Sequence, residues 1–313
     1  MLSRIADSLY WLHRYMERAD GMLRLMKTSY ILSFDKVQAS SMTWEPSLKI
    51  FTSLPNDEIE RLKKDNAAAL YYLFLESKNH NSFKSIITRA RENARGVQDQ
   101  ITKEVWEQVN QMYHQINQPG LKEKLAGPDA IITIDSFIHF SDQFCGISDS
   151  TMPRGQGWNY MNLGKYTERC LLTAEFTHSF FKKLDFSLND EQDIIFWRSL
   201  LLALSGYELH LKNYSNLNHN YNVLQQLAFD KNFPRSLYYA LDRANKYLTD
   251  IAASNPVEGS IQLLRTYGRL YSSVKFADIE LVEREGLEKY LIYVRKELNE
   301  FSRDLGRIYF SYS

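Results

Sequence analysis

The spacing of apolar residues is the feature of this sequence that most constrains its fold. Between clear breaks, apolar side chains recur at three- and four-residue steps, which is the period of an amphipathic helix. Alternation of the kind that indicates strands is absent, apart from the short ambiguous run at 131–134. The pattern predicts an all-α chain built as a multi-helix array. The clearest stripe lies within residues 2–27 and consists of Leu2, Ile5, Leu9, Leu12, Met16, Ala19, Leu23 and Met26.

Breaks between helices are few, because the 313 residues contain only 7 Pro and 13 Gly. The clearest breaks are at 118–120, 127–128 and 152–157, where these residues cluster. Helices are expected between the breaks. Their predicted ranges are 2–27, 58–76, 83–115, 131–145, 158–184, 190–212, 220–229, 235–253, 259–276 and 279–309.

Four short segments recur in the same order along the chain. Residues 14–18 (Arg-Tyr-Met-Glu-Arg) match 165–169 (Lys-Tyr-Thr-Glu-Arg), at an offset of 151 residues. The Trp44 region matches the Trp197 region at an offset of 153 residues. The remaining matches pair 73–76 with 227–230, and Lys84-Ser85-Ile86 with Arg235-Ser236-Leu237. The common order predicts a duplicated helical unit.

The repeat predicts a domain organisation. We expect a first helical repeat at 1–145, a connecting loop at 146–157, and a second repeat with additional C-terminal helices at 158–313. The two repeats are expected to be tandem, pseudo-symmetric and packed as one compact unit.

Charge and composition exclude several classes of protein. Lys plus Arg equals Asp plus Glu, at 38 each, so the chain lacks the basic excess typical of nucleic-acid binders. Two cysteines, Cys145 and Cys170, are too few for a disulfide framework or a zinc knuckle. No run approaches 18 uncharged apolar residues, and no signal peptide is evident at the N-terminus. We therefore expect a cytoplasmic protein that binds neither membrane nor nucleic acid.

Two clusters of opposite charges are the first candidate sites. On a helical wheel, Tyr10, Arg14 and Arg18 form a ladder, and Glu17 lies three residues from Arg14. Two guanidiniums beside a carboxylate could hold a carboxylate, a phosphate or an acidic partner. The alternative, which the frequency of interior ion pairs in bundles favours, is that they pair across helices and stabilise the fold. The candidates are Arg14, Glu17 and Arg18, with Lys165, Glu168 and Arg169 in the second repeat.

The segment 89–100 is the densest polar stretch predicted to be helical. Glu92, Arg95 and Asp99 have the spacing of intrahelical pairs, and they could complete a polar pocket with the first charge cluster. A solvated helix face with weak surface pairs is an equally good interpretation. Arg235 is a further candidate, because a cation in the first turn of a helix is unfavourable and suggests an acidic partner, although an accident of the cap region explains it better.

No residue pattern indicates a metal, a cofactor or a known catalytic site. Glu175 and His178 have the Glu-x-x-His spacing of di-metal bundles, but the positions 151 residues earlier are the cations Arg24 and Lys27. Nucleophile elbows, phosphate-binding Gly-rich loops and Cys-x-x-Cys motifs are absent from the sequence. The expectation is therefore no metal and no cofactor.

Several segments resemble the Alpha-E family, which is named for a helical domain with a Glu-Arg motif. They are 1–11 and 15–19 at the start, the block 91–101, Thr151–Arg154, Gly157-Trp158, 163–169 and 233–236. Departures are small, such as Lys165 where the family usually has Arg. The resemblance covers nearly the whole chain. It adds Arg154 to the candidate residues for binding an anion or a partner.

The resemblance implies a bacterial, wholly helical protein encoded beside, or fused to, an ATP-grasp-type ligase, and often near a transglutaminase-like protein. It therefore implies a non-catalytic accessory or substrate-binding partner in amide or peptide chemistry, with an acidic ligand or peptide as a possible target. The alternative that stays open is an enzyme in which Glu17 or Glu168 acts as acid or base. Beside two arginines, a carboxylate should have a lowered pKa, which suits anion binding or stability better than proton transfer.

Overall fold

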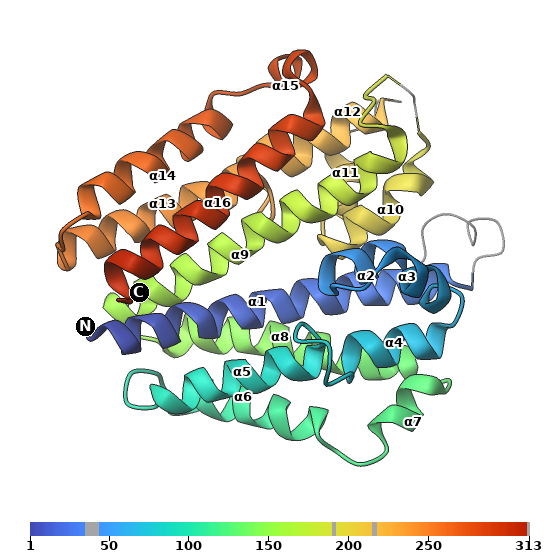
Figure 1. The fold of residues 1–313 in the computed structure, drawn as a ribbon, viewed down its shortest axis with the longest axis horizontal. Helices are drawn as coiled ribbons and strands as arrows, with labels where there is room; N and C mark the ends of the chain where they lie inside the picture. Colours follow the sequence, from blue (N-terminus) through green and yellow to red (C-terminus); the bar gives the residue numbers. More distant parts are fainter. Residues whose placement is uncertain (35–43, 190–191, 215–217, 312–313) are drawn as a thin grey trace. The chain divides into compact units, whose positions relative to one another are not determined.

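The computed structural model describes residues 1–34, 44–189, 192–214 and 218–311. Every regular element within these ranges is helical, and none is a β-strand (Figure 1). The predicted all-α fold class is thereby confirmed. In the part of the chain described, no helix combines the length and apolarity needed to cross a membrane.

The described residues up to position 151 form eight α-helices. α1 carries most of the predicted apolar stripe, and Leu9, Leu12 and Leu23 are fully buried, whereas Leu2 is exposed. The helices are α1 (Ser3–Leu32), α2 (Glu45–Phe51), α3 (Asn56–Leu62), α4 (Asn66–Phe74), α5 (Phe83–Gly96), α6 (Lys103–Ile116), α7 (Leu121–Ala126) and α8 (Ala130–Thr151).

A second set of eight α-helices follows in the described residues after position 155. Two short non-α turns, η1 (Lys182–Leu184) and the π-helical η2 (Gln225–Phe229), accompany them. The α-helices are α9 (Gln156–Phe181), α10 (Ile194–Ala203), α11 (Tyr207–Asn213), α12 (His219–Leu224), α13 (Leu237–Ser254), α14 (Ser260–Lys275), α15 (Ile279–Glu285) and α16 (Leu287–Tyr309).

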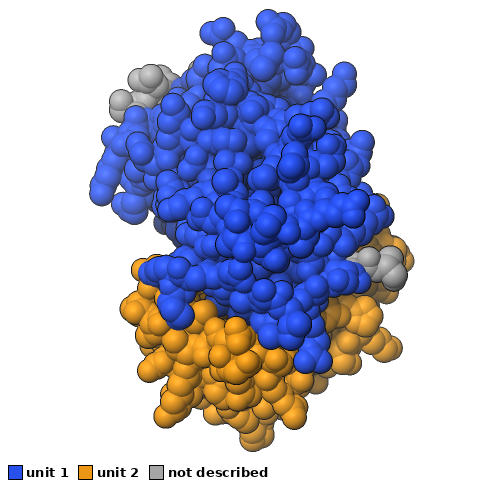
Figure 2. All heavy atoms as spheres, turned by 90° about the vertical axis from the view of Figure 1, so that its left-hand side faces the viewer, with its two compact units in different colours: residues 1–14, 153–313 blue, residues 15–152 orange. Residues whose placement is uncertain are grey.

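The structure divides into two compact units whose boundaries differ from those predicted. Unit 1 comprises Met1–Arg14 and Pro153–Ser313, and unit 2 comprises Tyr15–Met152 (Figure 2). One boundary therefore falls inside α1. The predicted loop at 146–157 is wrong, because α8 continues to Thr151 and α9 already begins at Gln156. Gly157 belonged to the predicted break at 152–157 and Gly146 to the predicted connecting loop, but both lie inside helices, which tolerate a Gly at a cost of about 1 kcal/mol.

Four long helices form the core of unit 1. α9 packs on α13 and α16, and α14 packs on the same two helices. The buried side of α16 illustrates the cause, since Leu291, Val294, Leu298 and Leu305 recur at helical steps and are fully buried. α9 is buried along most of its length.

Unit 2 is held by pairwise packing of its helices and by ion pairs. α6 packs on α5 and α8, and α7 packs on α4 and α8. Ion pairs from α1 to α8 join Lys27 Nζ to Asp135 Oδ1 at 2.6 Å and Arg24 Nη2 to Asp142 Oδ1 at 2.6 Å.

Several helices predicted as continuous are interrupted. The range 83–115 breaks between α5 and α6, and 279–309 breaks at Gly286, whose φ of +97° is incompatible with a right-handed helix. The ranges 58–76 and 190–212 also divide in two, and positions 190–191 lie outside the described residues. Apolar spacing continues across these short breaks because both flanking helices face a core, so periodicity alone does not reveal them.

The two sets of helices share local details. Trp44 Nε1 donates to Asn66 Oδ1 at 2.8 Å, and Trp197 Nε1 donates to Asn220 Oδ1 at 2.9 Å. Both indoles are fully buried, so each amide satisfies a donor that water cannot reach.

Serine caps are a second shared detail. Ser82 is the N-cap of α5 and Ser236 is the N-cap of α13, and each hydroxyl accepts from the backbone N–H three residues further on. The predicted match of Ser85 with Ser236 is therefore wrong in register, because Ser85 lies inside α5 and its hydroxyl donates to the carbonyl of Asn79.

Candidate functional site

A glycine determines how closely α1 and α9 approach in unit 1. A Cβ placed on Gly164 would lie 2.2 Å from the carbonyl oxygen of Tyr10 and 3.3 Å from Cγ of Arg14. The backbone of α1 therefore runs directly against this turn of α9. The contact requires a residue without a side chain, and it brings Arg14 next to the following turn of α9.

The close approach allows a buried ion pair between α1 and α9. Arg14 donates from Nε to Glu168 Oε2 at 2.8 Å, and Nη2 lies 2.7 Å from the same oxygen. The two side chains are only 5% and 2% exposed, respectively. Arg14 Nη1 also donates to the Tyr10 hydroxyl at 3.4 Å, and its guanidinium lies over the Trp11 ring at 4.5 Å. Separation of such a pair would leave a charge in a dry environment.

Arg14 stays protonated in this setting. Burial alone would lower its pKa, but Tyr10 and Glu168 together raise it above the ordinary value. The sequence grouped Arg14 with Glu17 on its own helix, whereas the structure gives it the carboxylate of Glu168 on another helix. The partner could not be predicted from helical spacing.

The arginines that follow the two glutamates bind the segments before neighbouring helices. Arg18 Nη1 donates to Asn81 Oδ1 at 3.4 Å, just before the N-cap of α5. Arg169 Nη1 donates to the carbonyl of Pro234 at 3.4 Å, just before the N-cap of α13. Glu17 is 2% exposed and therefore buried. Glu17 and Arg169 are therefore closed to bulk solvent, whereas Arg18 is partly exposed.

The segment 89–100 forms an ordinary solvated surface. Glu92 and Arg95 are exposed, and Arg95 Nη1 lies 3.9 Å from Glu92 Oε2, while Arg91 Nη1 lies 3.3 Å from Glu92 Oε1. α5 ends at Gly96, so Asp99 lies beyond the helix and the expected Arg95–Asp99 spacing is not helical. The solvated interpretation of this segment is thus the one that the structure supports.

Arg235 also differs from its predicted role. α13 begins at Leu237 with Ser236 as N-cap, so Arg235 lies before the helix and not in its first turn. The argument from the helix dipole fails for that reason. The Arg235 carbonyl instead accepts a hydrogen bond from Thr173 Oγ1 at 2.8 Å, which fixes this segment on α9.

Cations and aromatic rings alternate where α9 packs on α13 in unit 1. Arg154 lies over the Trp158 ring, with Cζ 3.7 Å from the centroid, and Arg243 lies over the Tyr239 ring at 5.1 Å. Lys165 Nζ is 5.6 Å from the centroid of Tyr166. We call this set, together with Tyr247, the α9–α13 face.

The tyrosines of the α9–α13 face join the two helices. Tyr166 stacks on Tyr247 with centroids 6.0 Å apart and planes at 12°, and it also contacts Tyr239 at 6.2 Å. Burial raises the pKa of Tyr247, while a hydrogen bond from Trp158 and the charges of Arg243 and Arg154 lower it. The result is a partly exposed surface of cations on fixed rings, with the Asp242 carboxylate 3.4 Å from Arg243 Nη2, and its excess of cations suits carboxylates and other anions.

Sequence reasoning identified only part of the α9–α13 face. It named Arg154 and Lys165 but missed Arg243 and the rings. A signal was available, because Tyr239, Arg243 and Tyr247 recur at i, i+4 and i+8 on one side of α13.

Three further reactive side chains, Cys170, Glu175 and His178, lie in surroundings that favour neither a thiolate nor a shared metal. Burial raises the pKa of the Cys170 thiol, so the thiolate is suppressed. Glu175 and His178 do not meet at a metal-binding position: Glu175 Oε1 lies 3.3 Å from Arg295 Nη2, and His178 Nε2 lies 3.9 Å from Glu288 Oε1. No group of three or more His, Cys, Asp and Glu suited to a metal occurs among the described residues.

Comparison with known proteins places the chain in a family. Residues 1–310 match the model of the Alpha-E family, described as "a predicted alpha-helical domain with a conserved ER motif". The chain belongs to the Alpha-E family. Glu17-Arg18 and Glu168-Arg169 are two Glu-Arg pairs of this Alpha-E chain, and each arginine holds the segment before a packed helix.

Two mycobacterial proteins resemble this Alpha-E chain at low identity. An uncharacterized protein of Mycobacterium bovis and one of Mycobacterium tuberculosis are each 22% identical over 329 residues. The match covers 97% of this chain but 36% of each relative, so the chain spans about a third of their length. No solved structure matches the chain.

Proposed function

We propose that this Alpha-E protein is a non-catalytic helical partner of an ATP-grasp-type amide or peptide ligase, and that its α9–α13 face binds an acidic segment of the ligase or of the ligase's substrate. One observation carries the binding role: Arg154, Lys165 and Arg243 lie on one partly exposed surface, each against an aromatic ring. Rings that hold cations in place lower the entropy lost when a carboxylate binds.

Burial of the Glu-Arg pairs supports a non-catalytic role. A general acid or base must reach its substrate within hydrogen-bonding distance and must titrate near the working pH. Glu168 is 2% exposed and bound to a guanidinium through Oε2. A substrate could approach this oxygen only after α1 and α9 separate, which the contact at Gly164 opposes.

The length of the relatives also supports an accessory role. An Alpha-E segment that accounts for 36% of a longer protein operates beside other parts of the same polypeptide. The α9–α13 face is a candidate surface for contact with such neighbours, because its cations lie against aromatic rings.

A binding experiment tests the proposal. The purified protein is mixed with the ATP-grasp ligase from the same genome, and association is measured by isothermal titration calorimetry at micromolar concentrations. The double variant Arg154→Glu/Arg243→Glu should weaken association at least about tenfold, because each reversal places like charges together. Arg265→Glu/Arg269→Glu is the matched control, since it changes the charge equally on exposed positions of α14.

Three outcomes would contradict the proposal. Lack of association at micromolar concentration would remove the partner role, and equal loss in both double variants would remove the α9–α13 face. Turnover of an amide or peptide substrate by the purified protein, abolished in Glu17→Gln, would replace the proposal with the enzymatic alternative.

We further infer that the two sets of helices descend from one duplicated eight-helix unit. Three observations support this inference: the common order α1–α8 and α9–α16, the Trp–Asn hydrogen bonds, and the serine N-caps of α5 and α13. An experimental structure in which residues 15–151 and 158–309 cannot be superimposed in that order would contradict it.

A further inference from the structure

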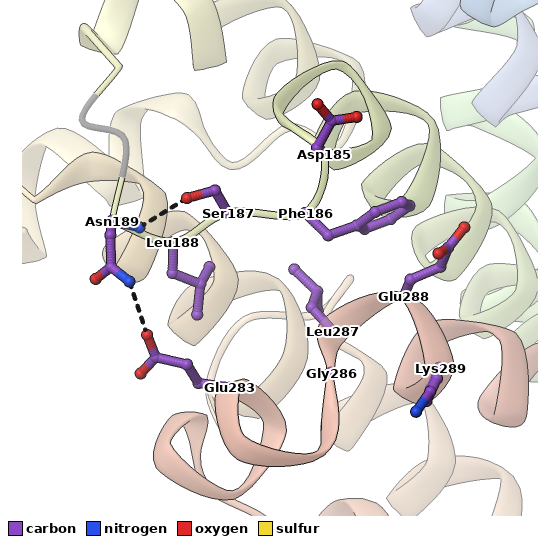
Figure 3. A pocket seen from close by; sticks show the side chains of 10 residues that line it. All are labelled: Asp185, Phe186, Ser187, Leu188, Asn189, Glu283, Gly286, Leu287, Glu288 and Lys289. Atoms are coloured by element: carbon purple, nitrogen blue, oxygen red, sulfur yellow. Dashed lines mark hydrogen bonds between the residues drawn. The ribbon is translucent and has the colours of Figure 1, made fainter.

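A cavity of about 380 Å³ lies in unit 1 where η1 and the segment after it meet the junction of α15 and α16 (Figure 3). It does not involve the residues of the α9–α13 face. Its volume is near the lower end of the range for small-ligand sites, about 300–1,000 Å³. The cavity is therefore suited to one long side chain and is too small for a folded element. Its lining consists of residues 185–189, Glu283 and residues 286–289.

The floor of the cavity is apolar. Phe186, Leu188 and Leu287 belong to the lining (Figure 3), and Leu188 and Leu287 are only 5% and 3% exposed. Phe186 is held from behind by the His178 ring, whose centroid is 5.1 Å away. An aromatic ring beside two aliphatic side chains gives a surface against which a methylene chain can pack.

The rim of the cavity is mainly acidic. Asp185, Glu283 and Glu288 are exposed carboxylates on the lining, and Lys289 is the cation on it. Asn189 Nδ2 donates to Glu283 Oε1 at 3.2 Å and so fixes this carboxylate at the edge. Three carboxylates against one ammonium leave a net negative rim, which favours a positively charged occupant.

Basic side chains also lie near the lining. Lys182 and Lys183 belong to η1, and Arg284 lies in the last turn of α15. Among the residues of the lining itself, carboxylates are in excess over cations.

We propose that this cavity binds an arginine or lysine side chain from a basic segment of a polypeptide partner. The aliphatic stem packs on Phe186, Leu188 and Leu287, and the charged head lies among the rim carboxylates. A guanidinium is the better match, because it can stack on the Phe186 ring while donating to carboxylates in its plane. This inference does not depend on the proposed function, since the cavity attracts cations whereas the α9–α13 face attracts anions.

Fluorescence anisotropy with a fluorescein-labelled (Gly-Arg)₃ peptide tests the inference on the full chain. The variant Glu283→Gln/Glu288→Gln should raise the Kd about fivefold, as expected for loss of two partly solvated ion pairs. Glu258→Gln/Glu280→Gln is the matched control, because it removes the same charge from exposed positions outside the lining. The control should change the Kd less than about twofold.

Two further probes identify the occupant. A labelled (Gly-Glu)₃ peptide should not bind, and spermidine should compete at least about tenfold less well than unlabelled (Gly-Arg)₃, because it lacks a planar guanidinium. Equal loss of affinity in the two double variants would overturn the cavity as the site. Equal competition by spermidine would overturn the polypeptide as occupant, and absence of saturable binding would overturn both. Thermal melting of each variant verifies that the fold is retained.

Discussion

The buried Arg14–Glu168 pair predicts that removal of one partner lowers the stability of the fold more than removal of both. The variant Glu168→Gln removes the carboxylate but leaves the Arg14 guanidinium buried at 5% exposure, without the charge that offsets its desolvation and helps to raise its pKa. A single-partner loss of this kind lowers the free energy of unfolding by about 3–5 kcal/mol. The reverse variant, Arg14→Met, should also be destabilising because the buried Glu168 then loses the guanidinium bound to its Oε2. Each single variant is thus expected to be severely destabilised.

The double variant Arg14→Met/Glu168→Leu should recover most of the loss. It removes both charges of this pair, and replacement of a buried ion pair by apolar side chains is often neutral or stabilising by about 1–4 kcal/mol. The double-mutant cycle should therefore give a coupling energy of at least about 2 kcal/mol between the two positions. Such coupling distinguishes a paired charge from two independent contributions to stability.

Urea unfolding followed by far-ultraviolet circular dichroism and tryptophan fluorescence measures these free energies. Both residues lie in unit 1, and the chain has two compact units, so the two signals must be compared before a two-state analysis is applied. A loss below about 1 kcal/mol in Glu168→Gln would refute the reasoning, since that is the scale of a solvent-exposed pair. Additive single effects would refute it equally.

Three further predictions follow from single side chains. Gly164→Ala should destabilise the protein by about 1–3 kcal/mol or more in urea unfolding, since the added Cβ would lie 2.2 Å from the carbonyl oxygen of Tyr10. Gly268→Ala is the control: a Cβ there meets open space, so this variant should stabilise the protein by about 0.4–1 kcal/mol. Burial lowers the pKa of His210 in the folded protein, so below about pH 6.5 the unfolded chain binds more protons at this residue than the folded one. The contribution of neutral His210 to the free energy of unfolding is therefore complete above about pH 6.5 and is lost as the pH falls below it. His210→Gln should therefore flatten the dependence of unfolding free energy on pH between 5 and 7. A thiol reagent should label Cys145 faster than Cys170 in the native protein and both after unfolding, because burial suppresses the Cys170 thiolate; equal native rates would contradict this.

Helix content was predictable from the sequence, but helix boundaries were less so. Amphipathic spacing is a local property, and α1 buries Leu9, Leu12 and Leu23 as that spacing requires. The break at Gly286 was missed because apolar residues continue on both sides of it. The predicted loop at 146–157 was wrong because single glycines are tolerated inside helices that pack well.

The candidate site was predicted only in part, because local spacing does not show which helices pack together. Arg154 and Lys165 were identified from the sequence, yet their association with Arg243 required the packing of α9 on α13. Glu92 and Arg95 looked equally suitable, and only their exposure shows that they belong to a solvated surface.

The sequence by itself determined that the chain is helical, which faces of its helices are apolar, and that two of these helices each carry a Glu-Arg pair. This much is local, because side chains a turn apart share a face whatever surrounds the helix. Only the tertiary structure decided that Glu168 neutralises Arg14. That choice depends on how closely α1 approaches α9 at Gly164, and a contact between residues so distant in the chain is decided by packing, about which local periodicity carries no information.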